Sequence, residues 1–277
     1  MYNTIKEYYD NITCFKTLIC GKERTKIKDN NFFPPPYPFV GNKYSTPVID
    51  GERISKVYIL SVNQNLESIY DDMTKDKARN SLYPTDFQSL KGHWYGPLNL
   101  SISLCNILFG IFLYGKYKFI SNKQIIENIS YGNCVRCGNP IARSGKPTSA
   151  MKKNCMEHTK FDIELLLPDY IFCIGRDPFY QVANCYDHKW IIDDFYYQLD
   201  INNKKIKVIY FYHYGIQQSV NTGAKMIKLL SNFNDNAKNL VNDIDQTTNS
   251  MDDVWRQAYT DFSKYYASQI IKHAIKC

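Results

Sequence analysis

Several features are missing from this 277-residue sequence, and each absence argues against a class of protein. The first residues, MYNTIKEYYDN, are polar and do not resemble a secretory signal. The longest apolar run, at residues 98–115, is interrupted by Ser101, Ser103 and Asn106 and is short for a membrane span. We therefore expect a buried helix there. The chain also has no internal repeat and no low-complexity region, so a repeat architecture is not expected.

The charge and the cysteine content narrow the setting in which the protein works. The 34 Lys and Arg residues against 27 Asp and Glu residues give a formal net charge of +7. This mildly basic balance fits a polyanionic partner and equally an ordinary soluble protein. The cysteines number nine, an odd count, and no signal peptide precedes them. We therefore predict a cytoplasmic protein whose thiols are buried, metal-bound or free.

The order of apolar runs predicts an α/β fold. Strands are expected at residues 56–62, near 128–133, at 169–175 and at 204–213, with helices near 100, near 160 and at the C-terminus. We predict a central, mostly parallel four-stranded sheet flanked by helices in three layers. The chain reads as a single domain over 1–277, with an N-terminal extension at 1–45 and C-terminal helical decoration at 231–277.

Three further features have structural interpretations. FFPPPYPFVG at residues 32–41 is too rich in proline for a helix or a central strand, so we expect an extended segment. IIDDFYYQLD at residues 191–200 is expected to be an insertion or a hairpin. Cys105, Cys173 and Cys185 have apolar or aromatic neighbours in the sequence and are predicted to lie in the core.

The most informative stretch begins at a predicted strand end and runs GNCVRCGNPIARSGKPTSAMKKNC, from residue 132 to residue 155. It joins Asn133, several thiols and a basic loop, and it leads to the strand that ends at Gly175. In open α/β sheets, ligands bind outside the carboxyl ends of the strands. Four predicted strand ends are polar, at residues 63–65, 133, 175–177 and 213. They indicate a binding site, although ordinary loops are polar as well.

These motifs resemble the uracil-DNA glycosylase superfamily, and most of all its iron–sulfur-containing branch. The resemblance rests on the stretch after Asn133, on LLPDYIFCIG, on GHWYG, on VIYFYHYG with His213 in place, and on CFKTLICGKER. It covers roughly residues 10–230 and is most specific at residues 133–175. The first loop, SVNQN, and the residues after His213 depart from the family pattern. The departures put uracil itself in doubt as the substrate.

The resemblance implies a site for removing a base from DNA. Asn63 would position the attacking water, with Asp71 or Asp72 as weaker candidates, and His213 would stabilise the departing base. Asn133 would pair with the edge of a pyrimidine, because its amide both donates and accepts hydrogen bonds. Asn65 is assigned to the same pocket, and Trp94 or Tyr95 would stack on the flipped base. Alternatively, Asn133 is a turn residue, His213 is a buried histidine, and Trp94 and Tyr95 belong to the core.

Contacts to DNA are predicted in two segments. In the first, basic side chains in or beside the loop would bind phosphates, namely Arg136, Arg143, Lys146, Lys152 and Lys153. In the second, Gln217 and Gln218 lie in the segment that would enter the duplex at the vacated position. A solvated loop is the alternative explanation for the basic residues.

Two metal sites are compatible with the cysteines. The resemblance implies a [4Fe–4S] cluster held by Cys14, Cys20, Cys137 and Cys155. The local spacing of Cys134, Cys137, Cys155 and His158 would instead suit zinc. The absence of any metal is the third alternative.

The sequence as a whole leads to one functional hypothesis and a rival. We expect a monofunctional DNA glycosylase that removes uracil or a modified pyrimidine and leaves an abasic site. Some members of the superfamily act in defence against phages and remove modified bases such as glucosylated hydroxymethylcytosine. The rival is a protein of the same fold that binds DNA or another partner without cleaving it.

Overall fold

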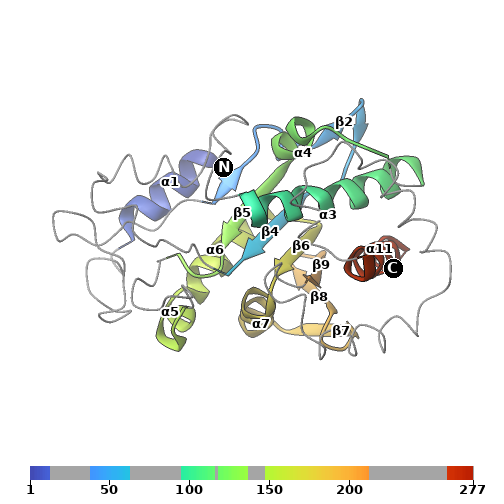
Figure 1. Cartoon of the computed structure of the whole chain (residues 1–277). Coiled ribbons are helices and arrows are strands. Elements are labelled where there is room, and N and C mark those ends of the chain that lie inside the picture. The colour runs from blue at the N-terminus through green and yellow to red at the C-terminus, as the bar shows by residue number, and fades with distance from the viewer. Residues whose placement is uncertain (13–37, 63–94, 116–117, 137–146, 212–260, 277) are drawn as a thin grey trace.

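The structure is a computed structural model that describes residues 1–12, 38–62, 95–115, 118–136, 147–211 and 261–276. Its strands are β1 (Phe39–Val40), β2 (Val48–Ile49), β3 (Glu52–Arg53), β4 (Val57–Ser61), β5 (Ile129–Asn133), β6 (Tyr170–Ile174), β7 (His188–Ile192), β8 (Tyr196–Ile201) and β9 (Lys204–Phe211). Seven of them form one sheet in the order β1-β5-β4-β6-β9-β8-β7, and β2 and β3 form a separate pair (Figure 1).

The four central strands of the sheet are parallel. β4 pairs with β5 on one side and with β6 on the other, and β6 pairs with β9. The predicted α/β fold with a mostly parallel sheet is therefore confirmed. The predicted number of four strands is wrong, because antiparallel strands extend both edges. β1 pairs with β5 at one edge, while β8 and then β7 follow β9 at the other.

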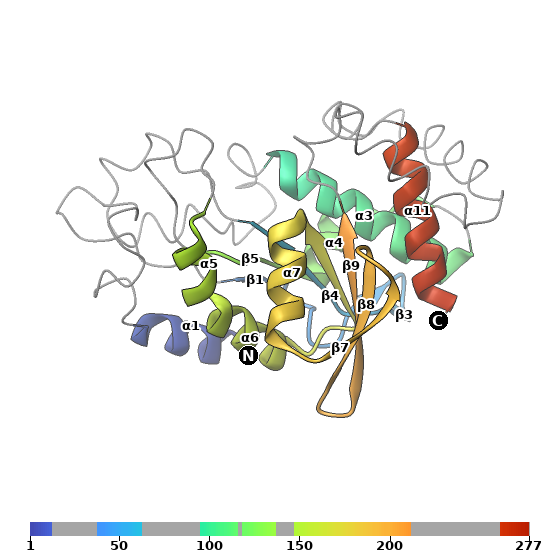
Figure 2. The ribbon, with the colours of Figure 1, turned by 90° about the horizontal axis from the view of Figure 1, so that it is seen from below.

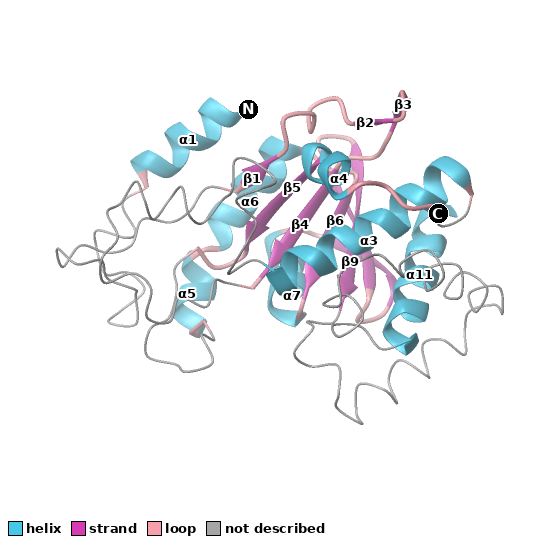
Figure 3. Cartoon of the chain, turned by 45° about the horizontal axis from the view of Figure 1, so that its top comes forward, coloured by secondary structure: helices cyan, strands magenta, loops and turns pink. Residues whose placement is uncertain are grey.

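Helices cover both faces of the sheet (Figures 2 and 3). One face carries α3 (Tyr95–Tyr114), α4 (Asn122–Asn128) and α11 (Asp261–Lys276). The other face carries α1 (Tyr2–Asn11), α5 (Ser149–Asn154), α6 (Met156–Leu166) and α7 (Arg176–Cys185). The helix predicted near residue 160 is α6, and a further helix, α5, begins inside the predicted basic loop and meets α6 at Cys155.

The apolar run at residues 98–115 forms most of α3, which lies in the core as predicted. Its residues 104–110 are all buried. The one strongly polar side chain in this stretch is satisfied, because Asn106 both donates to the Ile120 carbonyl (2.9 Å) and accepts from the Ile120 amide (3.0 Å). These bonds fix the connection from α3 to α4. None of the described helices is long and apolar enough to cross a membrane.

Two turns explain the path of the chain around the central strands. Gly175 has a φ of 103°, which lets the chain leave β6 and enter α7 at once. Residues other than glycine rarely adopt this backbone conformation. Asn202 and Asn203 both have positive φ values, as a tight two-residue hairpin between β8 and β9 requires. β7 and β8 form a second hairpin, which agrees with the expectation for residues 191–200.

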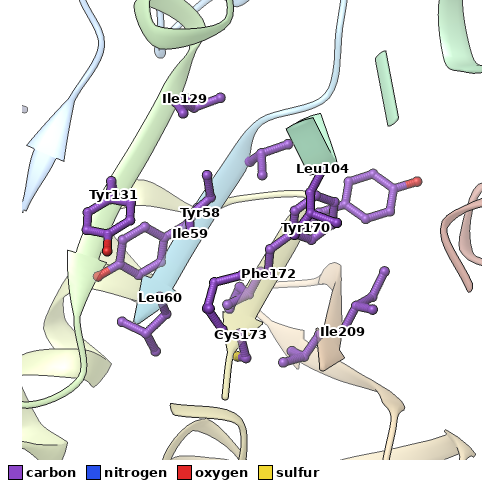
Figure 4. Close-up of a cluster of buried hydrophobic side chains, with 14 of the residues drawn as sticks. Tyr58, Ile59, Leu60, Leu104, Ile129, Tyr131, Tyr170, Phe172, Cys173 and Ile209 are labelled. Atoms are coloured by element: carbon purple, nitrogen blue, oxygen red, sulfur yellow. The ribbon is translucent and has the colours of Figure 1, made fainter. Parts of the chain in front are cut away.

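The core lies on both faces of the parallel strands. Every residue of β4, β5 and β6 is buried. Figure 4 shows side chains of β4, β5, β6 and β9 gathered with Leu104 of α3. Two of the three thiols predicted to be core, Cys105 and Cys173, are fully buried, while Cys185 is partly exposed. Phe39 and Val40 form an edge strand, which fits the extended segment predicted at residues 32–41.

Candidate functional site at the carboxyl edge of the sheet

The carboxyl ends of the four parallel strands lie at one edge of the sheet. β4 ends at Ser61, β5 at Asn133, β6 at Ile174 and β9 at Phe211. Asn63 and His213 each follow a strand by two residues and lie outside the described residues. Strands in a sheet lie about 4.8 Å apart, so the ends of β4 and β9 are separated by roughly 10 Å across β6. A nucleotide has the right size to span such an edge.

Asn133 is the last residue of β5 and lies at this edge. It is 2% exposed, and its Nδ2 group is buried without a hydrogen-bond acceptor among the described residues. Its register partner on β4 is Ser61, which is also buried. A buried donor without an acceptor costs about 1–3 kcal/mol. Such a group needs an explanation, and a ligand that supplies the acceptor is one.

The backbone that follows Asn133 is firmly held. The Cys134 amide donates to the Ser61 carbonyl (2.8 Å), and the Val135 amide donates to the Val62 carbonyl (2.9 Å). On the other side, Gln181 of α7 donates from Nε2 to the Cys134 carbonyl (2.8 Å). The ladder between β4 and β5 therefore continues past the end of the strands.

Two thiols near this edge, those of Cys134 and Cys173, are fully buried. Burial raises the pKa of the Cys134 thiol well above its usual value, and Cys155 and Asp177 raise it further. Burial likewise raises the pKa of Cys173. Only a thiolate acts as a nucleophile or metal ligand. Burial therefore favours the protonated form of Cys134 and Cys173, which is a poor nucleophile.

Arg136 corrects one of the sequence predictions. Its side chain was predicted to bind phosphate, but it is 1% exposed and forms an ion pair with Asp162 of α6. The same carboxylate accepts hydrogen bonds from the hydroxyls of Tyr9 (2.8 Å) and Tyr58 (2.9 Å). The guanidinium points into the protein because a buried carboxylate compensates its charge there. It is therefore not available to bind phosphate at the surface.

Lys152 remains at the surface beside the edge. Its Nζ lies 2.6 Å from Asp177 Oδ1, in the first turn of α7, and the two side chains are 36% and 38% exposed. Lys153 is exposed as well. These two lysines are the described members of the predicted basic set that solvent can reach. Their contact with phosphate stays a prediction.

The zinc site stays a prediction, because one of its four predicted ligands, Cys137, lies outside the described residues. Cys134, Cys155 and His158 are three of its four predicted ligands, but no group of three Cys, His, Asp or Glu side chains in the described ranges could hold a metal ion. The Nδ1 atom of His158 instead lies 2.9 Å from the Tyr8 hydroxyl. Burial lowers the pKa of His158 to about 4, and Arg136 lowers it too. His158 is therefore a neutral histidine of the core.

Most other predicted residues lie outside the described ranges, so their assignments stay predictions. They are Asn65, Trp94, Arg143, Lys146, Gln217, Gln218, Cys14, Cys20 and Cys137. Of the four predicted cluster ligands, only Cys155 is described, and it is buried at the junction of α5 and α6.

Tyr95 is the first residue of α3. Because α3 lies between the parallel strands β4 and β5 in the chain, it returns the chain from the carboxyl edge to the amino edge. Its first turn therefore belongs to the side of the sheet where Asn133 lies. Stacking of Tyr95 on a base stays a prediction.

A hollow of about 550 Å³ lies elsewhere, lined by residues 183–188. It surrounds the end of α7, which leads the chain away from the carboxyl edge, so it is separate from the site. We give more weight to the carboxyl edge, because the buried amide of Asn133 lies there.

Three residues near the site were not predicted from the sequence. Ser61 is the last residue of a predicted strand, and its place at the polar end could have indicated it. Asp162 and Gln181 lie on helices, and no local pattern marks them as partners of the segment after β5.

Comparison of the sequence with protein-family models gives no match, and comparison with curated proteins gives none either. The functional argument therefore rests on the site itself.

Proposed function

We propose that the protein is a DNA glycosylase that hydrolyses the N-glycosidic bond of a flipped-out base. The supporting observation is the buried Asn133 amide, whose Nδ2 group has no acceptor within the described part of the chain. A base that leaves the duplex is recognised by hydrogen bonds along its Watson–Crick edge. A pyrimidine carbonyl oxygen or ring nitrogen would supply the acceptor that Asn133 lacks.

The two catalytic roles go to residues that follow the neighbouring strand ends. Asn63, two residues beyond β4, would orient the attacking water, and β4 is the direct neighbour of β5. His213, two residues beyond β9, would donate a hydrogen bond to the departing base. The separation of roughly 10 Å between the ends of β4 and β9 leaves room for a sugar and a base between them.

The proposed reaction is a simple hydrolysis. The bond between C1′ of the sugar and the base nitrogen breaks, and its electron pair stays with the base. The sugar becomes cation-like before the water oxygen bonds to C1′. The proton lost by the water ends on the released base, which leaves an abasic site. Fixed donors near the leaving group lower the barrier, because they stabilise charge that develops only in the transition state.

A modified pyrimidine is the substrate that we favour. The loop SVNQN after β4 and the segment HYG after β9 lack the prolines of the glycosylase pattern. Loops without these prolines permit a wider pocket, which a bulky base such as glucosylated hydroxymethylcytosine would need. The net charge of +7 supports binding to DNA, whether or not its bases are modified.

A [4Fe–4S] cluster is a separate part of the proposal. Cys155 would be one ligand, together with Cys14, Cys20 and Cys137, and an all-thiolate set of four suits such a cluster. The cluster would support the loop after β5. Visible absorbance of the purified protein, with iron and sulfide analysis, tests this part without a DNA substrate.

The function is tested with a panel of DNAs that each carry one modified pyrimidine or uracil. Incubation with the protein is followed by alkaline cleavage, which reveals abasic sites. We expect release from at least one modified base, and loss of release by orders of magnitude in Asn63→Ala and His213→Ala with DNA binding retained. DNA binding without release from any substrate would favour the non-catalytic alternative. Absence of both would contradict the glycosylase and its rival together.

A further inference from the structure

Gln181 makes an unusual contact for a residue in the middle of a helix. It is 5% exposed on α7, where Pro178, Phe179 and Val182 are buried beside it. Its Nε2 group donates to the Cys134 carbonyl (2.8 Å) and to Thr159 Oγ1 (3.0 Å). The helix thereby reaches across to the backbone of the residue that follows Asn133.

Both backbone polar groups of Cys134 are therefore fixed by other elements. Its amide donates to the Ser61 carbonyl of β4, and its carbonyl accepts from Gln181. The Cys134 thiol also donates to the Val62 carbonyl (3.2 Å). With both peptide groups of Cys134 held, the end of β5 has little freedom, and the direction of the Cα–Cβ bond of Asn133 is restrained.

Packing alone does not explain a glutamine at this position. Burying an amide among apolar side chains is unfavourable unless its hydrogen bonds compensate. The Oε1 atom of Gln181 is buried without a donor among the described residues, so only Nε2 compensates. An apolar side chain of the same length would avoid this cost. The gain from Gln181 thus comes from its two hydrogen bonds, of which the one to the Cys134 carbonyl fixes the backbone beside Asn133.

We propose that Gln181 is a positioning residue that holds the Asn133 amide in its base-reading orientation. The proposal rests on the proposed function for its catalytic consequence, although the contact itself does not depend on it. Gln181 touches neither base nor water, and it acts through the backbone between residues 133 and 135. A shift of about 1 Å in a positioned group lowers rates about 100-fold.

The first test compares Gln181→Met with Gln198→Met. Methionine keeps the length of glutamine and removes the donor. Gln198, on β8, donates to the Tyr196 hydroxyl (3.1 Å) away from the carboxyl edge, so it is a matched control. In single-turnover assays we expect Gln181→Met to lower the rate of base release 10-fold to 100-fold, and Gln198→Met to leave it unchanged. Equal rates in wild type and Gln181→Met would overturn the proposal.

The second test uses Gln181→Glu, which gives a readout that a purely structural role would not produce. A protonated glutamate can donate to the Cys134 carbonyl, whereas an ionised one cannot. We expect base release close to wild type at acidic pH and a loss of activity as the new carboxyl group ionises. A pH profile parallel to that of wild type would contradict the proposal, even if Gln181→Met fails to fold.

A third measurement separates this proposal from the proposed function. The side-chain amide signal of Asn133 in a ¹⁵N-asparagine-labelled sample is identified by its absence in Asn133→Asp. We expect this signal to shift or broaden in Gln181→Met and to stay unchanged in Gln198→Met. If wild type releases no base, a changed signal upholds positioning while the glycosylase function fails. An unchanged signal overturns positioning.

Discussion

Asp162 is the centre of a buried polar cluster. Its carboxylate is fully buried and forms an ion pair with Arg136 from the segment after β5. It also accepts hydrogen bonds from Tyr9 of α1 and from Tyr58 of β4. A buried carboxylate is tolerated only when charge and hydrogen bonds compensate its lost hydration. This cluster therefore ties three separate elements to α6, and its Arg136 lies three residues after Asn133 in the chain.

Removing the cation from this cluster should be costly. We expect Arg136→Met to lower the free energy of unfolding by about 3–5 kcal/mol, because Asp162 is left buried without its counter-charge. Lys123→Met is the matched control, since Lys123 is 76% exposed and its pair with Glu127 spans 3.9 Å. The control should change stability by less than about 1 kcal/mol. Chemical denaturation measures both, and equal small losses would contradict the central role of Asp162.

His158 predicts a dependence of stability on pH. Burial and Arg136 lower its pKa to about 4 in the folded protein, from an ordinary value of 6.5. Between these values the unfolded chain binds a proton that the folded protein does not. The contribution of His158 to the free energy of unfolding is therefore fully present above pH 6.5. It is lost as the pH drops towards 4, which lowers the free energy of unfolding by about 3 kcal/mol.

The variant His158→Asn isolates this effect from the titration of carboxylates. Asparagine keeps a polar group near Nδ1, which lies beside the Tyr8 hydroxyl, but it does not titrate. We expect the difference in unfolding free energy between wild type and variant to shrink as the pH falls from 6.5 to 4. A difference that is constant over this range would show that His158 is not held neutral.

At the scale of elements, β5 depends on a glycine for its close packing. A Cβ atom at Gly132 would lie 3.1 Å from Arg136 Nη1 and 3.2 Å from Tyr58 Cε2, and it would be closer still to the Tyr58 hydroxyl. Because this hydroxyl donates to Asp162, no free space exists for the added methyl group. Gly132 thus lets β5 lie beside the Asp162 cluster.

We expect Gly132→Ala to destabilise the protein by about 1–3 kcal/mol through overpacking. Tyr58→Phe removes the atom in closest contact. In a double-mutant cycle it should therefore cost less in the Gly132→Ala background than in wild type. Thermal unfolding of the four proteins measures this coupling. Strictly additive effects would mean that the alanine is accommodated by a movement of β5 instead.

The elements differ in how well the sequence predicts them. The four parallel strands follow from their continuous apolar runs, which are typical of strands buried on both faces. β1 has two residues, and the acidic pair Asp193 and Asp194 follows β7, so neither edge gives a clear periodic signal. The edge segments were therefore expected only as an extended segment and as an insertion or a hairpin, not as members of the sheet. The sheet thus has seven strands where four were expected.

Site residues whose partners are distant in the sequence were also hard to predict. Asn133 could be predicted because it ends an apolar run, which is a feature of its immediate neighbours in the sequence. Arg136 could not be assigned correctly, since its partner lies 26 residues further along the chain on α6. Nothing in the sequence around Arg136 distinguishes a buried guanidinium from one that binds phosphate. Gln181 contacts a carbonyl 47 residues before it and was missed for the same reason.

At the scale of the whole molecule, the two faces of the sheet have different roles. α1, α6 and α7 hold the segment after β5 from one face through Asp162 and Gln181. α3 and α11 pack against each other on the opposite face (Figure 3). The carboxyl edge between the two layers is where a buried amide is left without a described partner. This arrangement provides a fixed amide at the edge where open α/β sheets bind ligands.

The most direct test of the account is single-turnover base release by wild type and by Asn133→Ala, on the modified-base substrate that wild type prefers. Thermal unfolding and DNA affinity are measured on the same samples. The account predicts release by wild type and a fall of roughly 100-fold or more in Asn133→Ala, with stability and DNA affinity little changed. Equal release by the two proteins would contradict the role of Asn133, and no release by wild type from any substrate would contradict the proposed function.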